Sequence, residues 1–216
     1  MKIVTLFSLI FTTLLLTGCT QRAAYDYSAF KESKPTSILV LPPLNHSPDV
    51  KAGASLQSQI TFPLAESGYY VLPVAVTNET FRQNGVTEAA DIHSLPIKKL
   101  HEIYGADTAL YLDIKDYGTS YIVVSSETVV TAHARLVDLR TGKLLWEGSA
   151  SASSAEQQNN SGGGLIGMLV VAVVNQIANT ITDKGHEIAG ITSYRLLSAD
   201  MPNGILYGPY SPKYHK

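Results

Sequence analysis

Cysteine is nearly absent from this chain of 216 residues, in which Cys19 is the only one. No disulfide can therefore cross-link the fold, and no second thiol is available as a nucleophile. Charged side chains are also scarce, at 16% of residues, and 16 basic residues stand against 18 acidic ones. This balance gives no reason to expect binding to nucleic acid or to an anionic membrane.

Motifs of catalysis and cofactor binding are missing as well. No G-x-S-x-G elbow occurs, although a Ser-His-Asp set assembled from distant positions stays open. The run 162–167 matches G-x-G-x-x-G, but a polar stretch precedes it where a dinucleotide site needs a strand. His186 and Glu187 begin like a zinc-protease helix, but Gly190 stands where the second ligand is needed. We therefore expect no enzyme, no cofactor and no metal site. We also expect six solvated or hydrogen-bonded histidines, namely His46, His93, His101, His133, His186 and His215.

The amino terminus has the pattern of a lipoprotein signal. Lys2 precedes an apolar run over residues 3–16, and Leu16-Thr17-Gly18-Cys19 follows. The run is shorter than the roughly 20 apolar residues that a spanning helix needs. We expect a peptidase to remove residues 1–18 and the Cys19 sulfur to carry a diacylglyceryl group, with palmitate-type chains as the anchor. Thr20 in place of Asp indicates the outer membrane under Gram-negative sorting rules, on its periplasmic face or at the cell surface.

The expected mature chain has three parts. Residues 19–37 are mostly polar or small and predict a tether, which would reach about 60 Å if extended. Residues 38–200 predict one α/β domain, since roughly 100–200 residues suit a single domain. The tail 201–216 is rich in proline and glycine and is expected to be irregular.

Hydrophobic periodicity predicts a βαβ unit at the start of the domain. Residues 38–41 form an apolar run closed by two prolines, which is typical of a buried strand. A helix over 54–67 and a short strand over 69–72 follow, so the two strands should be parallel. Helices are then expected over 76–83 and 96–105.

From Thr108 the period changes to two, which predicts an antiparallel meander of strands over 108–117, 121–138 and 143–153. Its last turn is strongly specified, with Asp138 at the entry and Gly142 where a positive φ is needed. The fold class is therefore α/β, a single-domain sandwich with a mixed sheet and a long C-terminal helix.

That last helix is expected over 165–190, after a polar and glycine-rich link at 153–164. Its first half is apolar on every side. Three interpretations stay open: burial in the core, a surface for a second copy or partner, and insertion into a membrane or larger pore. The partner-interface candidates are Leu165, Ile166, Met168, Leu169, Val170 and Val173.

Several segments resemble a proteobacterial lipoprotein family that includes a meningococcal genome-derived vaccine antigen. They are Leu41-Pro42-Pro43-Leu44-Asn45, Gly105-Ala106-Asp107 and the runs 63–74, 136–146 and 203–209. The resemblance covers nearly all of the mature chain. It implies a fold similar to the amino-terminal domain of the Tol system's propeller protein and to the curli-secretion lipoprotein, and it brings no catalytic residues.

The anchor, the missing motifs and the resemblance together predict a non-enzymatic envelope lipoprotein. We expect an assembly or accessory component of a transport or secretion complex that acts through protein–protein contacts. The expected partners are further copies of the chain and envelope proteins, among them a curli-secretion-like lipoprotein. The alternative is a binding module that regulates a peptidoglycan synthase or binds a small ligand.

Overall fold

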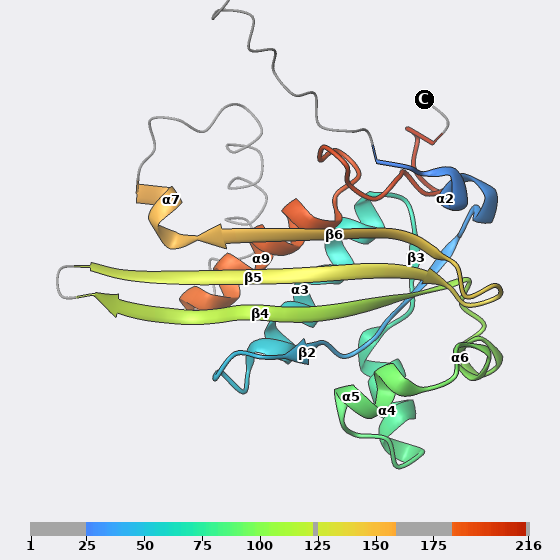
Figure 1. Ribbon diagram of the computed structural model, residues 1–216, viewed down its shortest axis with the longest axis horizontal. Coiled ribbons are helices and arrows are strands. Elements are labelled where there is room, and N and C mark those ends of the chain that lie inside the picture. Colours follow the sequence, from blue (N-terminus) through green and yellow to red (C-terminus); the bar gives the residue numbers. More distant parts are fainter. Residues whose placement is uncertain (1–24, 123–124, 159–182, 215–216) are drawn as a thin grey trace, which may run out of the picture.

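The computed structural model describes residues 25–122, 125–158 and 183–214. One mixed sheet runs through the molecule, and helices pack on both of its faces (Figure 1). Its strands lie in the order β3-β1-β4-β5-β6, with β2 beside β4. The strands are β1 (Ser37–Val40), β2 (Leu44–Asn45), β3 (Tyr70–Val71), β4 (Thr108–Ile122), β5 (Ser125–Asp138) and β6 (Leu144–Ser153).

The strand directions confirm the predicted mixed α/β sheet. β1 pairs in parallel with β3 and with β4, as the βαβ prediction requires. β4, β5 and β6 form the antiparallel meander. The short strand β2 was not expected, because it follows the two prolines that end β1; it pairs in parallel with β4.

The predicted helices before the meander are confirmed, with small shifts at their ends. The helices are α2 (Ser28–Ser33), α3 (Ala52–Glu66), α4 (Val74–Gln83), α5 (Ala89–Ser94), α6 (Ile97–Tyr104), α7 (Ser154–Gln158) and α9 (Lys184–Leu197). The short helices α2, α5 and α7 were not predicted.

The C-terminal helix corrects the prediction of one helix over 165–190. α9 begins at Lys184, because Asp183 has an extended backbone and its carboxylate accepts a hydrogen bond from the Gly185 N–H. It also continues past Gly190 to Leu197, since burial of its side chains outweighs the helix-breaking tendency of glycine. Residues 165–182 of the predicted helix lie outside the described residues.

Two hydrophobic cores lie on opposite faces of the sheet. The first joins Ile38, Val40 and Leu112 to apolar residues of α3 and α9. The second joins Leu39 and Leu41 to residues of α4, α5 and α6. The alternation along β1 follows from the two-residue period of a strand, which sends successive side chains to opposite faces.

The segment before β1 differs from the expected tether. Residues 28–33 form α2, and Phe30 is buried in the first core. The Tyr27 hydroxyl donates to the Gly204 carbonyl at 2.6 Å, and the Glu147 N–H donates to the Tyr25 hydroxyl at 2.9 Å. Residues 25–37 therefore pack on the globule, because aromatic side chains in this segment find buried partners.

The tail contains no helix or strand over residues 201–214, as expected, but it is packed. Ile205 is buried in the first core. The Gly208 N–H donates to the Ser67 carbonyl at 2.8 Å, and the Tyr210 N–H donates to the Gly68 carbonyl at 3.1 Å. A Cβ at Gly208 would lie 2.3 Å from the Gly68 oxygen, so the close contact requires glycine.

Candidate interaction surfaces

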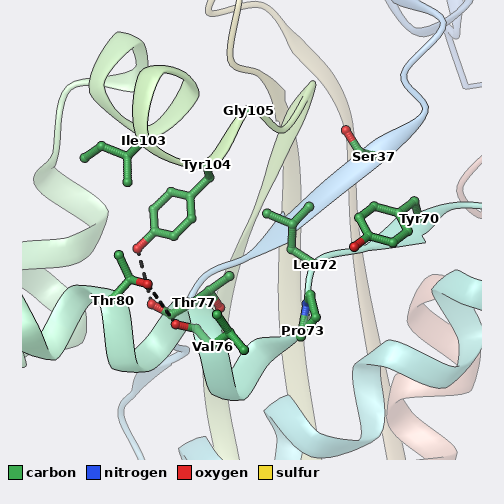
Figure 2. Close-up of a pocket in the computed structure, with 10 residues that line it drawn as sticks. All are labelled: Ser37, Tyr70, Leu72, Pro73, Val76, Thr77, Thr80, Ile103, Tyr104 and Gly105. Carbon is green, nitrogen blue, oxygen red and sulfur yellow. Dashed lines mark hydrogen bonds between the residues drawn. The ribbon is translucent and has the colours of Figure 1, made fainter.

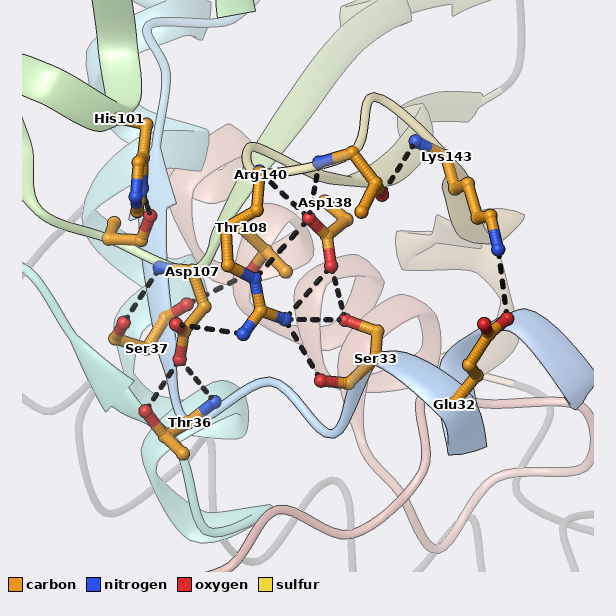
Figure 3. A network of polar contacts seen from close by, with 12 residues as sticks. Glu32, Ser33, Thr36, Ser37, His101, Asp107, Thr108, Asp138, Arg140 and Lys143 are labelled. Atoms are coloured by element: carbon orange, nitrogen blue, oxygen red, sulfur yellow. Dashed lines mark hydrogen bonds and ion pairs between the residues drawn. The ribbon is translucent and has the colours of Figure 1, made fainter. Parts of the chain in front are cut away.

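A network of polar contacts fastens α2 to the turn between β5 and β6 (Figure 3). Asp138 ends β5 with its side chain almost fully buried. Its carboxylate accepts hydrogen bonds from the N–H groups of Arg140 and Thr141, as the predicted turn requires, and one from the Ser33 hydroxyl of α2. Gly142 completes the turn with a φ of 76°. The predicted hairpin is confirmed, and it also holds the chain before β1.

Arg140 lies at the centre of this network. Its guanidinium donates to Asp138 and to the Ser33 carbonyl, both at 2.9 Å, and lies 3.5 Å from Asp107. Although burial alone would raise the pKa of Asp138, hydrogen bonds from Arg140 and Ser33 hold it well below its usual range. Asp107 in turn accepts from both the N–H and the hydroxyl of Thr36. The network is thus a structural clamp, with its charges already paired.

The first hollow lies at the edge of the sheet beside β3 and has a volume of about 470 Å³ (Figure 2). We call it the β3-edge hollow. Three of its side chains are large, apolar and unusually exposed: Tyr70 at 56%, Val76 at 63% and Ile103 at 56%. No charged residue lines it; the lining consists of Ser37, Tyr70, Leu72, Pro73, Val76, Thr77, Thr80, Ile103, Tyr104 and Gly105.

The polar groups of the β3-edge hollow are few. The Tyr104 hydroxyl donates to the Thr77 carbonyl at 3.2 Å, and burial raises the pKa of Tyr104 to about 12. β3 is the last strand of the sheet on this side, so its outer edge pairs with no other strand among the described residues. An exposed edge beside an uncharged hollow is a surface on which another polypeptide can pack.

The second hollow, the sheet-face groove, has a volume of about 750 Å³. The Arg135 guanidinium lies 5.5 Å from the centre of the Tyr111 ring, and His93 packs edge-on against the same ring. Burial lowers the pKa of His93, whose Nε2 lies 2.9 Å from the Pro42 carbonyl oxygen. Lys98 and Arg140 also line the groove, and no acidic residue does.

The third hollow lies between α2 and the C-terminal tail and has a volume of about 430 Å³. We call it the α2–tail hollow. Its lining combines lysines and aromatic residues with one proline and one leucine: Phe30, Lys31, Lys34, Pro35, Tyr69, Leu206, Tyr207, Lys213 and Tyr214. The Tyr69 hydroxyl donates to the Leu206 carbonyl at 2.5 Å, which fixes the tail against the end of α3.

A serine and a histidine meet between α3 and α9. The Ser55 hydroxyl lies 2.9 Å from His186 Nδ1, and Tyr117 donates to the same hydroxyl at 2.8 Å. The other ring nitrogen of His186 faces the Gln59 amide at 2.6 Å. A hydrolytic triad places a carboxylate there, so this contact resembles a clamp between two helices more than a nucleophile and its base. No sequence motif indicates this contact, because the two residues are 131 positions apart.

Two further histidines are each held by a single side-chain contact. His46 Nε2 lies 3.0 Å from Asp113, and His101 Nδ1 lies 2.8 Å from the Ala106 carbonyl. Residues 25–122, 125–158 and 183–214 contain no group of three or more potential metal ligands. In the same part of the chain, no helix is long and apolar enough to cross a bilayer. Other predicted site residues lie outside the described residues: Cys19, Leu165, Ile166, Met168, Leu169, Val170, Val173 and His215.

Comparison with known proteins identifies relatives over most of the chain. A family model described as "Putative lipoprotein GNA1162-like" matches residues 25–210. A lipoprotein of Neisseria meningitidis serogroup B, NMB1124/NMB1162, is 54% identical over 198 residues, which cover 91% of each chain.

One solved structure gives the same result. The crystal structure of lipoprotein GNA1162 from N. meningitidis is 57% identical and has a TM-score of 0.55, over 68% of this chain and 100% of that one. The NMR structure of E. coli LpoB is 17% identical, with a TM-score of 0.41, over 64% of this chain and 74% of that one. The resemblance expected from the sequence is confirmed by the first structure and the family model: the chain belongs to the GNA1162-like lipoprotein family.

Proposed function

We propose that this protein is a non-enzymatic accessory lipoprotein of the cell envelope, anchored by acyl chains on Cys19 in the outer membrane. It acts through protein–protein contacts within a transport or secretion complex. Its family consists of lipoproteins, which supports a place in the envelope. The observation that carries the proposed mode of action is the β3-edge hollow.

The hollow suits a protein partner for three reasons. Its exposed apolar side chains, Tyr70, Val76 and Ile103, are in contact with water until something covers them. Its lining has no charge, so covering it does not strip water from an ion. The free edge of β3 also presents backbone groups to which an added strand can bond.

Substitutions that place a carboxylate in the β3-edge hollow test whether a protein partner packs there. Val76→Asp and Ile103→Asp should each weaken partner capture roughly tenfold or more, because a buried carboxylate without a partner costs more than about 1.4 kcal/mol. Val50→Asp is the matched control, since Val50 is 92% exposed in the loop between β2 and α3. The readout is photo-crosslinking from each position in native membranes, with the lipid anchor intact. Equal crosslinking and equal complex size for all three variants would contradict the proposal.

The anchor is tested separately. Cys19→Ser should abolish acylation and release the protein from the outer membrane. A variant that stays in that membrane at the same processed size would contradict the role of Cys19.

The sheet-face groove supports a second candidate function, a module that binds an acidic ligand or regulates a peptidoglycan synthase. Arg135 forms no ion pair among the described residues, and the groove lining has no carboxylate to neutralise it. The same capture experiment separates the candidates. If Arg135→Gln abolishes the capture of a peptidoglycan synthase and Val76→Asp does not affect it, the second candidate function is favoured.

A further inference from the structure

We infer that the α2–tail hollow faces the membrane, and that Lys31 and Lys34 bind the phosphate groups of anionic lipid headgroups. This inference rests on the proposed lipid anchor at Cys19. It goes further, because an anchor alone leaves the orientation of the globule undetermined.

Covalent reach is the first reason. Six residue steps separate Cys19 from Tyr25, which allow at most about 22 Å. Tyr25 is already part of the globule, since its hydroxyl accepts from the Glu147 N–H of β6. The lipid is therefore held far closer than the 60 Å of the expected tether, and the side of the molecule where the chain enters must lie near the bilayer.

The hollow lies on that side. Figure 1 shows α2 and the C-terminal tail together at the end of the molecule where residue 25 begins the described chain. The side chains of Tyr25 and Tyr27 are in contact, with ring centres 4.8 Å apart, and α2 starts at the next residue. Lys31 and Lys34 stand at the end of this helix, six and nine positions after Tyr25.

The lysines are carried on a rigid support. Phe30 is buried beside them, and Ser33 between them is bonded to both Asp138 and Arg140. Lys34 ends α2 with a φ of 48°, so the backbone at this position is fixed by the helix terminus. Both lysines line the same hollow, so their side chains lie on one face of the protein.

Charge complementarity is the second reason. No acidic residue lines the hollow. The nearby carboxylates have partners of their own. Glu32 pairs with Lys143, and Asp200 pairs with Lys213. Asp26, whose charge also acts on Lys31, accepts a hydrogen bond from the Ser28 N–H at 2.9 Å. Lys31 and Lys34 form no ion pair with any residue in the described ranges. Their positive charge is therefore available to a phosphate, although the mature chain as a whole is expected to be acidic.

The aromatic lining fits the same surroundings. Tyr207 and Tyr214 line the hollow with the lysines, and Tyr210 in the same tail is exposed. Tyrosine is enriched where proteins meet the headgroup layer, because its ring is apolar and its hydroxyl is polar. A basic residue near an anionic membrane surface contributes about fivefold in binding, the equivalent of about 1 kcal/mol.

Amine labelling of the intact lipoprotein tests the orientation. The acylated full protein is placed in vesicles of phosphatidylethanolamine and phosphatidylglycerol, recovered by flotation, and labelled in parallel with protein in a neutral detergent. Lys31 and Lys34 should react about fivefold more slowly in vesicles, and high salt should reverse most of the difference. Lys51 is the internal control, because it is exposed and precedes α3, and the loop before α3 lies across the molecule from α2 (Figure 1).

The outcomes separate the two proposals. Protein that fails to float contradicts the anchor at Cys19 and this inference with it. Protein that floats without selective protection of Lys31 and Lys34, or with equal protection in phosphatidylcholine vesicles, overturns only the headgroup contact.

A double variant gives a second test. Lys31→Gln with Lys34→Asn removes both charges, and asparagine tolerates the left-handed backbone at position 34. Lys213, the third lysine of the hollow, serves as the reporter. Its protection in anionic vesicles should fall toward the value in detergent, whereas Lys51→Gln should leave it unchanged. Full protection of Lys213 in the double variant would contradict the role of the two lysines.

Discussion

The β3-edge hollow and the α2–tail hollow are similar in size, at about 470 and 430 Å³, but their linings differ. The first has no charged residue, and its exposed side chains are apolar. The second combines three lysines with aromatic rings. A contact with the first should depend on shape and on excluded water, and a contact with the second should weaken in salt.

The two hollows are also formed by different structural elements. The β3-edge hollow lies between two short helices and a strand of two residues at the end of the sheet. The α2–tail hollow is built on a buried aromatic residue and a paired buried carboxylate. Both sides are tied to a core, the side proposed to face a partner through Phe81 and Leu100 and the side proposed to face the lipid through Phe30.

The largest effect is expected from Phe30→Ala. Phe30 is 4% exposed in the first core, so its truncation should lower the free energy of unfolding by about 3–5 kcal/mol. Phe62→Ala is the matched control, because Phe62 on α3 is 39% exposed and should cost far less. Urea unfolding can be followed by the fluorescence of Trp146, the only tryptophan. Equal losses for the two variants would show that α2 is not part of the cooperative domain.

A smaller effect is expected from Asp138→Asn. The substitution removes the charged acceptor of Arg140 and Ser33 and should cost about 1.5–3 kcal/mol at neutral pH. The pKa of Asp138 is lowered in the folded protein, so its contribution is complete above the unfolded value of about 3.9 and is lost as the pH falls below it. Wild-type stability should therefore drop more steeply below about pH 4 than that of the variant.

Glu79→Gln is the control for this prediction. Glu79 also pairs with an arginine, Arg82, but the pair is exposed on α4, and its loss should not change stability measurably. Parallel acid unfolding curves for wild type and Asp138→Asn would contradict the proposed clamp.

The sequence predicted those helices and strands in which a hydrophobic pattern repeats several times. Leu56, Ile60 and Leu64 recur along α3, and alternation from Thr108 onward predicted the meander. The short helices α2 and α5 each bury one large apolar residue, Phe30 and Ile92. A single buried side chain has no period, so these helices form because of tertiary contacts that no local pattern reveals.

The candidate surfaces were less predictable than the fold. The β3-edge hollow brings together Ser37, the residues after Tyr70 and the end of α6, which only the parallel pairing of β1 and β3 makes neighbours. The overall composition gave no reason to expect contact with an anionic membrane. Net charge does not show how the fold distributes basic and acidic side chains over the surface. At moderate salt the charges of Lys31 and Lys34 are screened beyond about 10 Å. Their attraction to an anionic headgroup would therefore depend on the charges around them more than on the net charge of the chain.

The smallest effect is expected from Tyr104→Phe in the β3-edge hollow. Loss of the hydrogen bond to Thr77 should cost about 0.5–1.5 kcal/mol at neutral pH. Because burial raises the pKa of Tyr104 to about 12, its phenol ionises first in the unfolded chain, near pH 10. Wild type should therefore lose stability between about pH 10 and 12, and its advantage over the variant should shrink there.

The matched control for Tyr104→Phe is Tyr70→Phe, because Tyr70 lines the same hollow but is 56% exposed. This substitution should leave stability nearly unchanged at neutral pH. The measurement is the difference in urea midpoint between each variant and wild type across the alkaline range. A constant difference for Tyr104→Phe would mean that its hydroxyl is solvated, and that the hollow is wetter than its uncharged lining implies.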